Sequence, residues 1–213
     1  MGKCVIFCAG GFSCLLEPIA GDDYIIAADG GYAHVRALGL TPNCLLGDFD
    51  SLGYVPDKAL VYPTKKDDTD AMLAVRRGLE LGYKEFILYG TLDGPRLDHT
   101  LANVQLLHFL ASHGATGWLI GNTAAATVIQ NRIARFPATA TGYFSVFCLG
   151  AKATGITLEG AEYTLENGTL TPDFPLGASN RFCGKPARIS VKDGALLLIW
   201  DRENGLCEVT DED

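Results

Sequence analysis

The chain has 213 residues, 48% of them hydrophobic, so it can bury a sizeable core without disulfide bonds. Its formal net charge is −8 and it has no basic run, which argues against a protein that binds the phosphate backbone of nucleic acids. No apolar stretch approaches the roughly 18 to 20 residues of a membrane span, and the first residues do not resemble a signal peptide, so we expect a cytoplasmic protein without membrane contact.

Strand-like and helix-like patterns alternate along the first 131 residues. Apolar runs that end in glycine or aspartate predict strands over residues 4–10, 24–31, 43–50, 59–64, 85–90 and 117–122. Helical spacing of apolar residues predicts helices over residues 33–40, 67–82 and 96–114. This alternation is typical of an α/β domain with a mostly parallel sheet that helices cover on both faces.

From residue 132 the chain changes to short β-like runs with no helical pattern. Gly, Asn, Pro and Asp interrupt these runs every eight to twelve residues, as in an antiparallel β fold. The runs cover residues 144–149, 155–160, 161–167, 168–174, 187–194 and 195–200. We therefore predict an α/β domain over residues 1–131 and an all-β antiparallel sandwich or barrel over residues 132–213.

Two aspartates, Asp48 and Asp50, end the apolar run of the strand predicted over residues 43–50. Alternate side chains of a strand point to one face, so these two carboxylates would point the same way. Asp29 ends another predicted strand, and ligand sites of open α/β sheets lie beyond such strand ends. Converging carboxylates favour a cation between them, and Mg²⁺ prefers oxygen ligands. The alternative is a solvated turn containing Gly47 and Ser51.

A second acidic pair, Asp67 and Asp70, lies at the start of the helix predicted over residues 67–82. The spacing of three places both side chains on one face of the helix. Either residue could instead cap the helix and favour its dipole. Acidic residues follow four successive predicted strands, however, and capping alone does not require that repetition at the edge where ligands bind.

A third group of polar residues surrounds the start of the longest predicted helix: Arg96, Asp98, His99 and Asn103. The N-terminus of a helix binds phosphate through its backbone amides, and Arg96 could bind a phosphate oxygen through two N–H groups. The alternatives are that Asp98 caps the helix and that His99 is a structural, hydrogen-bonded histidine.

Five motifs, in this order, resemble those of thiamin pyrophosphokinases: AADGG (27–31), GDFDS (47–51), KDDTD (66–70), PRLDHTLAN (95–103) and GASNRF (177–182). The resemblance covers both halves of the chain. It implies an α/β nucleotide-binding domain, a thiamine-binding β domain and a homodimer. It also implies an enzyme that transfers the β,γ-diphosphate of ATP to the hydroxyl of thiamine, giving thiamine diphosphate and AMP. One departure is Pro95, which follows Gly94 where the family commonly has a glycine pair before the arginine, so we expect a different turn here.

The resemblance also implies roles for particular residues. It assigns catalysis to Asp48, Asp50, Asp70 and Asp98, and a Mg²⁺ site to Asp48, Asp50, Asp67 and Asp70. It assigns binding of ATP and its diphosphate to Asp29, Gly30, Thr69, Arg96, His99 and Asn103. Ser179 and Asn180 would bind thiamine at an interface between subunits, and Trp200 lies near this region but could belong to the core.

Two other functions remain open from the sequence: a Mg²⁺-dependent phosphohydrolase that uses the same carboxylates, and a non-catalytic protein that binds nucleotide or thiamine. The seven cysteines form no CxxC pair and their spacings fit no zinc pattern. We expect them to be buried, reduced thiols, as is usual in the cytosol.

Overall fold

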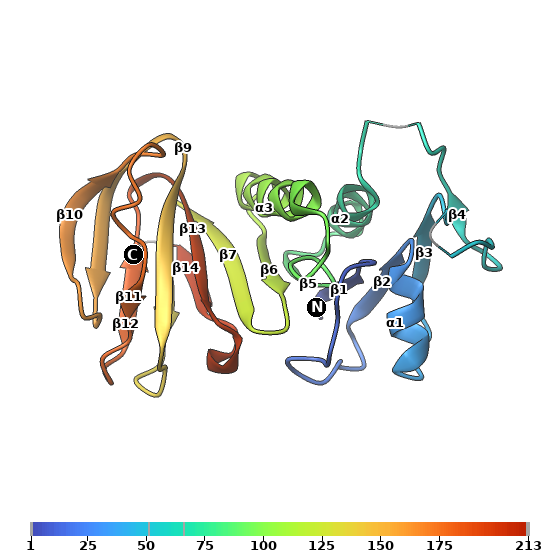
Figure 1. Cartoon of the computed structure of the whole chain (residues 1–213), viewed down its shortest axis with the longest axis horizontal. Helices are drawn as coiled ribbons and strands as arrows, with labels where there is room; N and C mark the ends of the chain where they lie inside the picture. The colour runs from blue at the N-terminus through green and yellow to red at the C-terminus, as the bar shows by residue number, and fades with distance from the viewer. Residues whose placement is uncertain (1, 51, 66, 212–213) are drawn as a thin grey trace. The chain divides into compact units, whose positions relative to one another are not determined.

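The structure is a computed structural model that describes residues 2–50, 52–65 and 67–211. The chain forms two units of similar size, coloured from blue to red along the sequence in Figure 1. The first unit comprises Met1–Leu106 and Leu119–Asn122, and the second comprises Leu107–Trp118 and Thr123–Asp213. Ser51 of the GDFDS motif and Lys66 of the KDDTD motif lie outside the described residues.

The first unit is built on a parallel sheet with the strand order β5-β1-β2-β3-β4. Its elements are β1 (Cys4–Phe7), β2 (Tyr24–Ala28), α1 (Gly31–Ala37), β3 (Cys44–Gly47), β4 (Leu60–Val61), α2 (Asp70–Glu80) and β5 (Glu85–Tyr89). Helix α3 (Leu97–Ser112) and strand β6 (Thr116–Ile120), which lies beside β5, each contribute residues to both units. The central strands β1 and β5 are almost wholly buried, as expected for strands covered on both faces.

The two helices α1 and α2 cover opposite faces of this sheet. The connection from β2 to β3 through α1 runs toward one edge, whereas the connection from β4 to β5 through α2 runs back across the sheet. Right-handed crossovers that run in opposite directions place their helices on opposite faces, and Figure 1 shows this arrangement. Because these strands are parallel, their carboxyl ends lie at one edge of the sheet, and the turns that follow the strands begin there.

The second unit is antiparallel, with the strand order β14-β8-β12-β9-β13-β7. Its elements are β7 (Ala124–Gln130), β8 (Arg132–Phe136), β9 (Tyr143–Glu159), β10 (Leu165–Leu170), β11 (Asn180–Arg181), β12 (Ala187–Ser190), β13 (Asp193–Asp201), the 3-10 helix η1 (Arg202–Asn204) and β14 (Glu208–Asp211). The long strand β9 also pairs with β10 and β11. It contains Gly150 and Gly155 with φ values of 91° and 66°, which lets one strand bend and pair with different partners along its length.

The predicted fold class, an α/β part followed by an antiparallel β part, is confirmed. Several details differ from the prediction. The runs 144–149 and 155–160 are one strand, β9. Strand β10 joins the end of the run 161–167 to the start of the run 168–174 and ends at Leu170, shortly before Pro172. Strands β7, β8, β11 and β14 were missed, and the predicted boundary after residue 131 falls between β7 and β8.

All seven cysteines are free thiols. Five are buried as predicted, but the prediction of burial is wrong for Cys14 and Cys183, which are exposed. Among the described residues, no helix is both long enough and apolar enough to cross a membrane.

Candidate functional site

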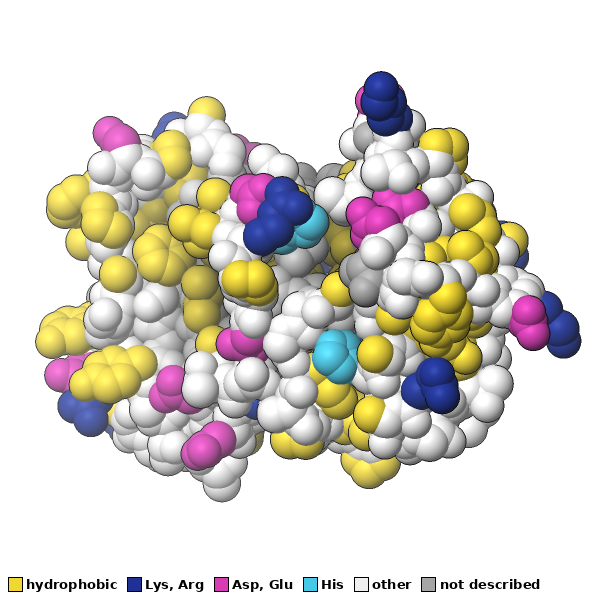
Figure 2. Space-filling model, turned by 45° about the vertical axis from the view of Figure 1, so that its right-hand side comes forward, with side chains coloured by type: hydrophobic (Ala, Val, Ile, Leu, Met, Phe, Trp, Pro, Cys, Tyr) yellow, Lys and Arg dark blue, Asp and Glu magenta, His cyan; other side chains and the backbone are white. Residues whose placement is uncertain are grey.

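A cleft of about 570 Å³ opens in the first unit, where the turns that follow β1, β2, β3 and β5 meet the first residues of α2 and α3. In Figure 2, acidic side chains gather beside a hollow in this face of the molecule. Eight of the predicted site residues line the cleft: Asp29, Asp48, Asp50, Thr69, Asp70, Arg96, His99 and Asn103. The structure describes three further predicted site residues of this unit that do not line the cleft: Gly30, Asp67 and Asp98.

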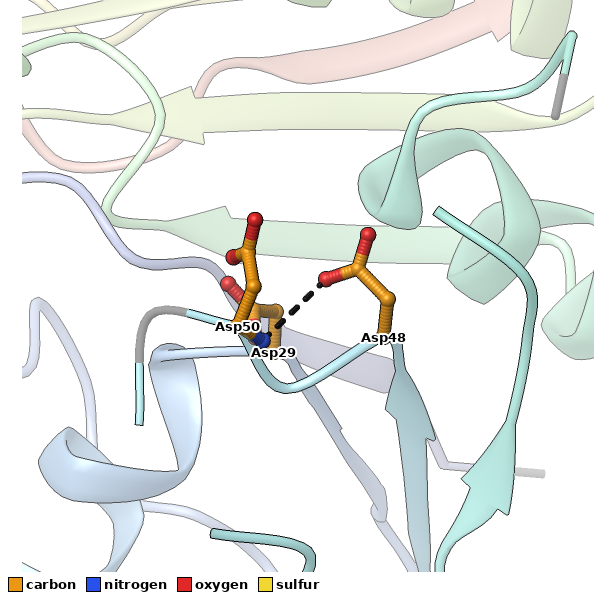
Figure 3. A group of neighbouring side chains, drawn as sticks. All are labelled: Asp29, Asp48 and Asp50. Carbon is orange, nitrogen blue, oxygen red and sulfur yellow. Dashed lines mark hydrogen bonds between the residues drawn. The ribbon is translucent and has the colours of Figure 1, made fainter. Parts of the chain in front are cut away.

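Three carboxylates meet at one side of the cleft. Asp29, Asp48 and Asp50 each offer an oxygen atom, and these oxygens lie within 4.8 Å of one another. Figure 3 shows the three side chains rising to the same side of the turns that carry them. Asp29 and Asp48 are half-buried and Asp50 is exposed. Oxygen ligands at this spacing could hold a metal ion, and a hard divalent cation suits carboxylates best.

The turn after β3, rather than a continued strand, brings Asp48 and Asp50 together. The strand geometry that the sequence suggested through residue 50 ends at Gly47, and Phe49 adopts a left-handed conformation with φ 59°. The backbone N–H of Asp50 then donates to Oδ1 of Asp48 at 3.3 Å. The expected convergence is therefore present, but a tight turn produces it and strand alternation does not.

A glycine lets this turn approach the end of β2. The backbone N–H of Asp29 donates to the carbonyl oxygen of Leu46 at 2.8 Å, so the two strand ends are joined. A Cβ atom on Gly47 would lie only 3.0 Å from the backbone nitrogen of Asp29, and Gly47 has a φ of 145°. A glycine at position 47 therefore holds Asp29 close to the aspartate pair.

The start of α2 forms a second acidic side of the cleft. Thr69 caps the helix because its Oγ1 accepts a hydrogen bond from the N–H of Met72 at 3.2 Å. Asp70, in the first turn of the helix, lines the cleft, as does Asp68. The Asp68 carboxylate lies 3.0 Å from Nε of Arg76. Sequence reasoning selected Asp67 and missed Asp68, although both belong to the same acidic motif.

The start of α3 contributes the basic side. Arg96 and His99 line the cleft, whereas Asp98 binds the Arg96 guanidinium through both carboxylate oxygens at 3.3 and 2.6 Å. This hydrogen bonding holds the pKa of Asp98 below its usual range and raises the pKa of Arg96. Asn103 is buried, and its Nδ2 donates to the carbonyl oxygen of Thr91 at 2.9 Å.

The ends of β1 and β2 contribute further lining residues, and the glycines after β2 shape the start of α1 behind them. Cys8 was missed as a site residue; burial, and then the charges of Asp70 and Asp29, raise the pKa of its thiol to about 12. Gly30 is the N-cap of α1. A Cβ atom on the next residue, Gly31, would lie 2.0 Å from the carbonyl oxygen of Phe7, so a glycine at position 31 lets α1 lie close to β1.

The two residues predicted to bind thiamine lie in the second unit. Oδ1 of Asn180 accepts the backbone N–H of Tyr163 at 3.0 Å and of Arg181 at 2.8 Å, and its Nδ2 donates to the Tyr163 carbonyl at 2.7 Å. Asn180 also lines a small cavity of about 130 Å³. Ser179 is exposed, with φ 59°, and its N–H donates to Oγ of Ser145. Trp200 is 2% exposed and therefore belongs to the core.

Comparison with known sequences gives two matches that follow one another along the chain. Residues 17–118 match the family described as "Thiamin pyrophosphokinase, catalytic domain", and residues 130–196 match "Thiamin pyrophosphokinase, vitamin B1 binding domain". The chain is 28% identical, over an alignment 217 positions long, to the thiamine pyrophosphokinase of Bacillus subtilis (strain 168), a match that covers 92% of this chain and 98% of the relative.

Solved structures are similar over nearly the whole chain. The crystal structure of thiamin pyrophosphokinase from Geobacillus thermodenitrificans gives a TM-score of 0.74 at 25% identity, covering 93% of this chain and 96% of its own. Two others support the fold. Thiamine pyrophosphokinase from Bacillus subtilis gives a TM-score of 0.80 at 24% identity, covering 94% and 99%, and the yeast enzyme gives 0.64 at 15%, covering 86% and 80%. The family and enzyme class predicted from the five motifs are confirmed.

Proposed function

The chain belongs to the thiamin pyrophosphokinase family, and we propose that it transfers the diphosphoryl group of ATP to thiamine. The thiamine hydroxyl oxygen forms a bond to the β-phosphorus of ATP, and the bond from this phosphorus to the oxygen bridging to the α-phosphate breaks. AMP leaves with that oxygen, and the hydroxyl proton is released. The observation that carries this proposal is the cleft that joins three carboxylates to Arg96 and His99 at the sheet edge where α/β folds bind ligands.

We propose that Asp29, Asp48 and Asp50 bind Mg²⁺, with Asp70 in the same cleft. The acidic cluster fits such an ion because its oxygens lie within 4.8 Å of one another in a chain of net charge −8. When bound, the ion would neutralise negative charge on the polyphosphate and on the departing AMP. The family resemblance adds Asp67 to the metal site. This residue is exposed and lies three residues before α2 begins at Asp70.

We propose that the other cleft residues position the nucleotide. Arg96 carries a guanidinium that can bind two phosphate oxygens, and it would exchange its exposed pair with Asp98 for a phosphate. His99 lies in the first turn of α3, which begins directly after Arg96. Asn103 would act by holding the turn at Thr91, since its amide already donates to that backbone. Gly30 and Thr69 would shape the starts of α1 and α2 around the phosphates.

We propose that residues 1–131 carry catalysis and that residues 132–213 bind thiamine, in a cytoplasmic homodimer with the thiamine site at the subunit interface. Ser179 is exposed and could hydrogen-bond the pyrimidine ring, while Asn180 would hold the loop that presents it. A mixture of Ser179→Ala and Asp48→Asn variants tests this interface. Heterodimers would contain one intact composite site, so after subunit exchange, at thiamine concentrations well below the KM, the activity should exceed the mean of the two separate variants. Demonstrated heterodimers without this excess activity would contradict the shared site.

The decisive experiment for the reaction is product analysis with purified protein, ATP, Mg²⁺ and thiamine. We expect AMP and thiamine diphosphate in equal amounts, and an Asp48→Asn variant as the matched control with strongly reduced turnover. Free phosphate or pyrophosphate that forms independently of thiamine would instead identify a phosphohydrolase. Binding of ATP and thiamine without turnover would identify a non-catalytic binding protein.

A further inference from the structure

The turns that follow β1 and β5 are joined to each other beyond the ends of their strands. The N–H of Gly10 donates to the carbonyl oxygen of Gly90 at 3.0 Å, and the N–H of Gly11 donates to the carbonyl oxygen of Asp93 at 3.1 Å. Gly11 and Asp93 thus form an isolated antiparallel bridge. The two turns therefore behave as one backbone layer at the edge of the sheet.

Glycines allow this close approach, and the joined turns form part of the cleft wall. A Cβ atom on Gly10 would lie 2.5 Å from the carbonyl oxygen of Gly90, and one on Gly11 would lie 2.7 Å from that of Asp93. Gly10, Gly90 and Gly94 line the cleft beside the acidic cluster. A displacement of either turn would therefore change the shape of the space where a polyphosphate would bind.

The Asp93 side chain adds a third turn to this layer. Its Oδ2 accepts the backbone N–H of Asn122, the second residue after β6, at 2.6 Å. Asp93 is exposed and lies outside the described lining of the cleft, so its carboxylate contacts the turns and not the proposed ligand. One residue thus joins the turns after β1, β5 and β6, through its backbone oxygen on one side and its carboxylate on the other.

Other residues hold the glycine turn after β1 from the opposite side. A ring nitrogen of His34 lies 2.9 Å from the carbonyl oxygen of Gly10. Phe12 packs against the ring of His34 at 5.3 Å and against Phe7 at 5.6 Å between ring centroids. On this side the turn is fixed by packing in the first unit. On the side of β6, the fixing contact is the bond between Asp93 and Asn122.

We infer that Asp93 is a positioning residue for the nucleotide: it fixes the three joined turns in the place where the polyphosphate of ATP binds. This inference rests on the proposed function for its ligand. Phosphoryl transfer depends mainly on positioning and charge stabilisation, so a loosened wall weakens nucleotide binding without removing a reacting group. Asp93 lies outside the five motifs that carry the resemblance to the family, two residues before Pro95.

The test compares Asp93→Ala, which removes the acceptor, with Asp93→Asn, which keeps a neutral acceptor for the N–H of Asn122. We expect Asp93→Ala to raise the KM for ATP roughly tenfold and to leave the KM for thiamine unchanged, and Asp93→Asn to restore ATP binding to within about threefold of wild type. Amide hydrogen exchange should become faster at Asn122 and Gly11 in Asp93→Ala. If Asp93→Ala does not fold, Asp93→Asn alone is the test: its KM for ATP should rise about two- to threefold and its KM for thiamine should stay unchanged.

Asp23 provides a matched control. It also accepts backbone N–H groups, from Lys3 and Ala20 at 2.8 Å each, but it lies immediately before β2, at the opposite edge of the sheet. Asp23→Ala should lower the melting temperature and leave the KM for ATP unchanged. Unchanged ATP affinity in Asp93→Ala, or equal loss of ATP and thiamine affinity, would overturn the inference. If wild-type protein neither turns over nor binds Mg²⁺–ATP in calorimetry, the proposed function fails. Exchange at Asn122 and Gly11 then decides whether Asp93 holds the turns, and unchanged exchange overturns the inference.

Discussion

Replacing Asp50 by asparagine should make the protein more stable and less active, provided that the acidic cluster exists to bind a cation. The Asp50 carboxylate is exposed and belongs to the group of three whose oxygens lie within 4.8 Å of one another. Asparagine keeps the size of the side chain and removes only its charge. The turn also keeps its own hydrogen bond, because that bond uses the backbone N–H of residue 50 and Oδ1 of Asp48.

The expected gain in stability follows from the spacing of the charges. Two unit charges 4.8 Å apart repel by about 0.9 kcal/mol in water, and physiological salt reduces this to roughly half. Asp50 repels both Asp29 and Asp48, so Asp50→Asn should raise the free energy of unfolding by about 1 kcal/mol in metal-free buffer. A bound cation should make wild type the more stable of the two proteins, because a ligand at a hundred times its dissociation constant stabilises the native state by about 2.7 kcal/mol.

The assay is urea denaturation of wild type and Asp50→Asn in EDTA and in Mg²⁺, together with turnover of ATP and thiamine. We expect the variant to be the more stable protein in EDTA, to gain less from Mg²⁺ than wild type, and to lose about 10²-fold in kcat. A variant that is less stable than wild type in EDTA, gains as much from Mg²⁺ and turns over at the wild-type rate would refute the argument. The aspartates would then be turn residues only.

Four further outcomes are expected. EDTA should abolish product formation and Mg²⁺ should restore it, whereas full turnover in thoroughly metal-free buffer would contradict the metal-bound site. Gly47→Ala should lower the free energy of unfolding by about 1 to 3 kcal/mol in a denaturant titration, because φ is 145° and the new Cβ would press on the backbone at the end of β2. It should also reduce kcat. Alkylation at pH 8 should label Cys14 and Cys183, while Cys8, buried with a pKa raised to about 12 and therefore protonated, reacts only after unfolding, as mass spectrometry can show. Ser179→Ala should raise the KM for thiamine by about two- to tenfold and leave the KM for ATP unchanged, in steady-state kinetics with each substrate varied.

The sequence predicted the acidic edge of the sheet because local signals determine it. Apolar runs ended by Asp29 and Asp48 are strands in the structure, and parallel strands bring their ends to a common edge. The arrangement of the three carboxylates depends on a turn that the sequence pattern could not reveal, because a phenylalanine does not indicate a left-handed conformation. Similarly, the sequence pattern did not distinguish Asp67 from Asp68, which lines the cleft and pairs with Arg76.

Long-range pairing explains most of what was missed. The bond between Asp93 and Asn122 joins turns that are 29 residues apart, and no periodicity in the sequence marks it. Strand β7 escaped prediction because AAATVIQ begins with three alanines, which have a low preference for strands, and its place is determined by pairing with β13. The hydrogen bonds of Asn180 to the backbone of Tyr163, 17 residues away, are another long-range contact that the sequence pattern does not mark, and its predicted thiamine-binding role stays a prediction.

The conformation of the turn after β3 argues that it is built to present its aspartates. Asp29 and Phe49 both have positive φ, at 48° and 59°. Aspartate tolerates this region, but a bulky residue such as phenylalanine adopts it rarely and at a cost of about 1 to 3 kcal/mol. Phe49 is 2% exposed, and burial of its ring contributes about 1.5 to 3 kcal/mol, which offsets that cost. A turn selected only for solvation would use glycine or asparagine at this position. Here the buried Phe49 ring fixes the backbone between Asp48 and Asp50, so the two carboxylates are held beside Asp29 although they repel each other.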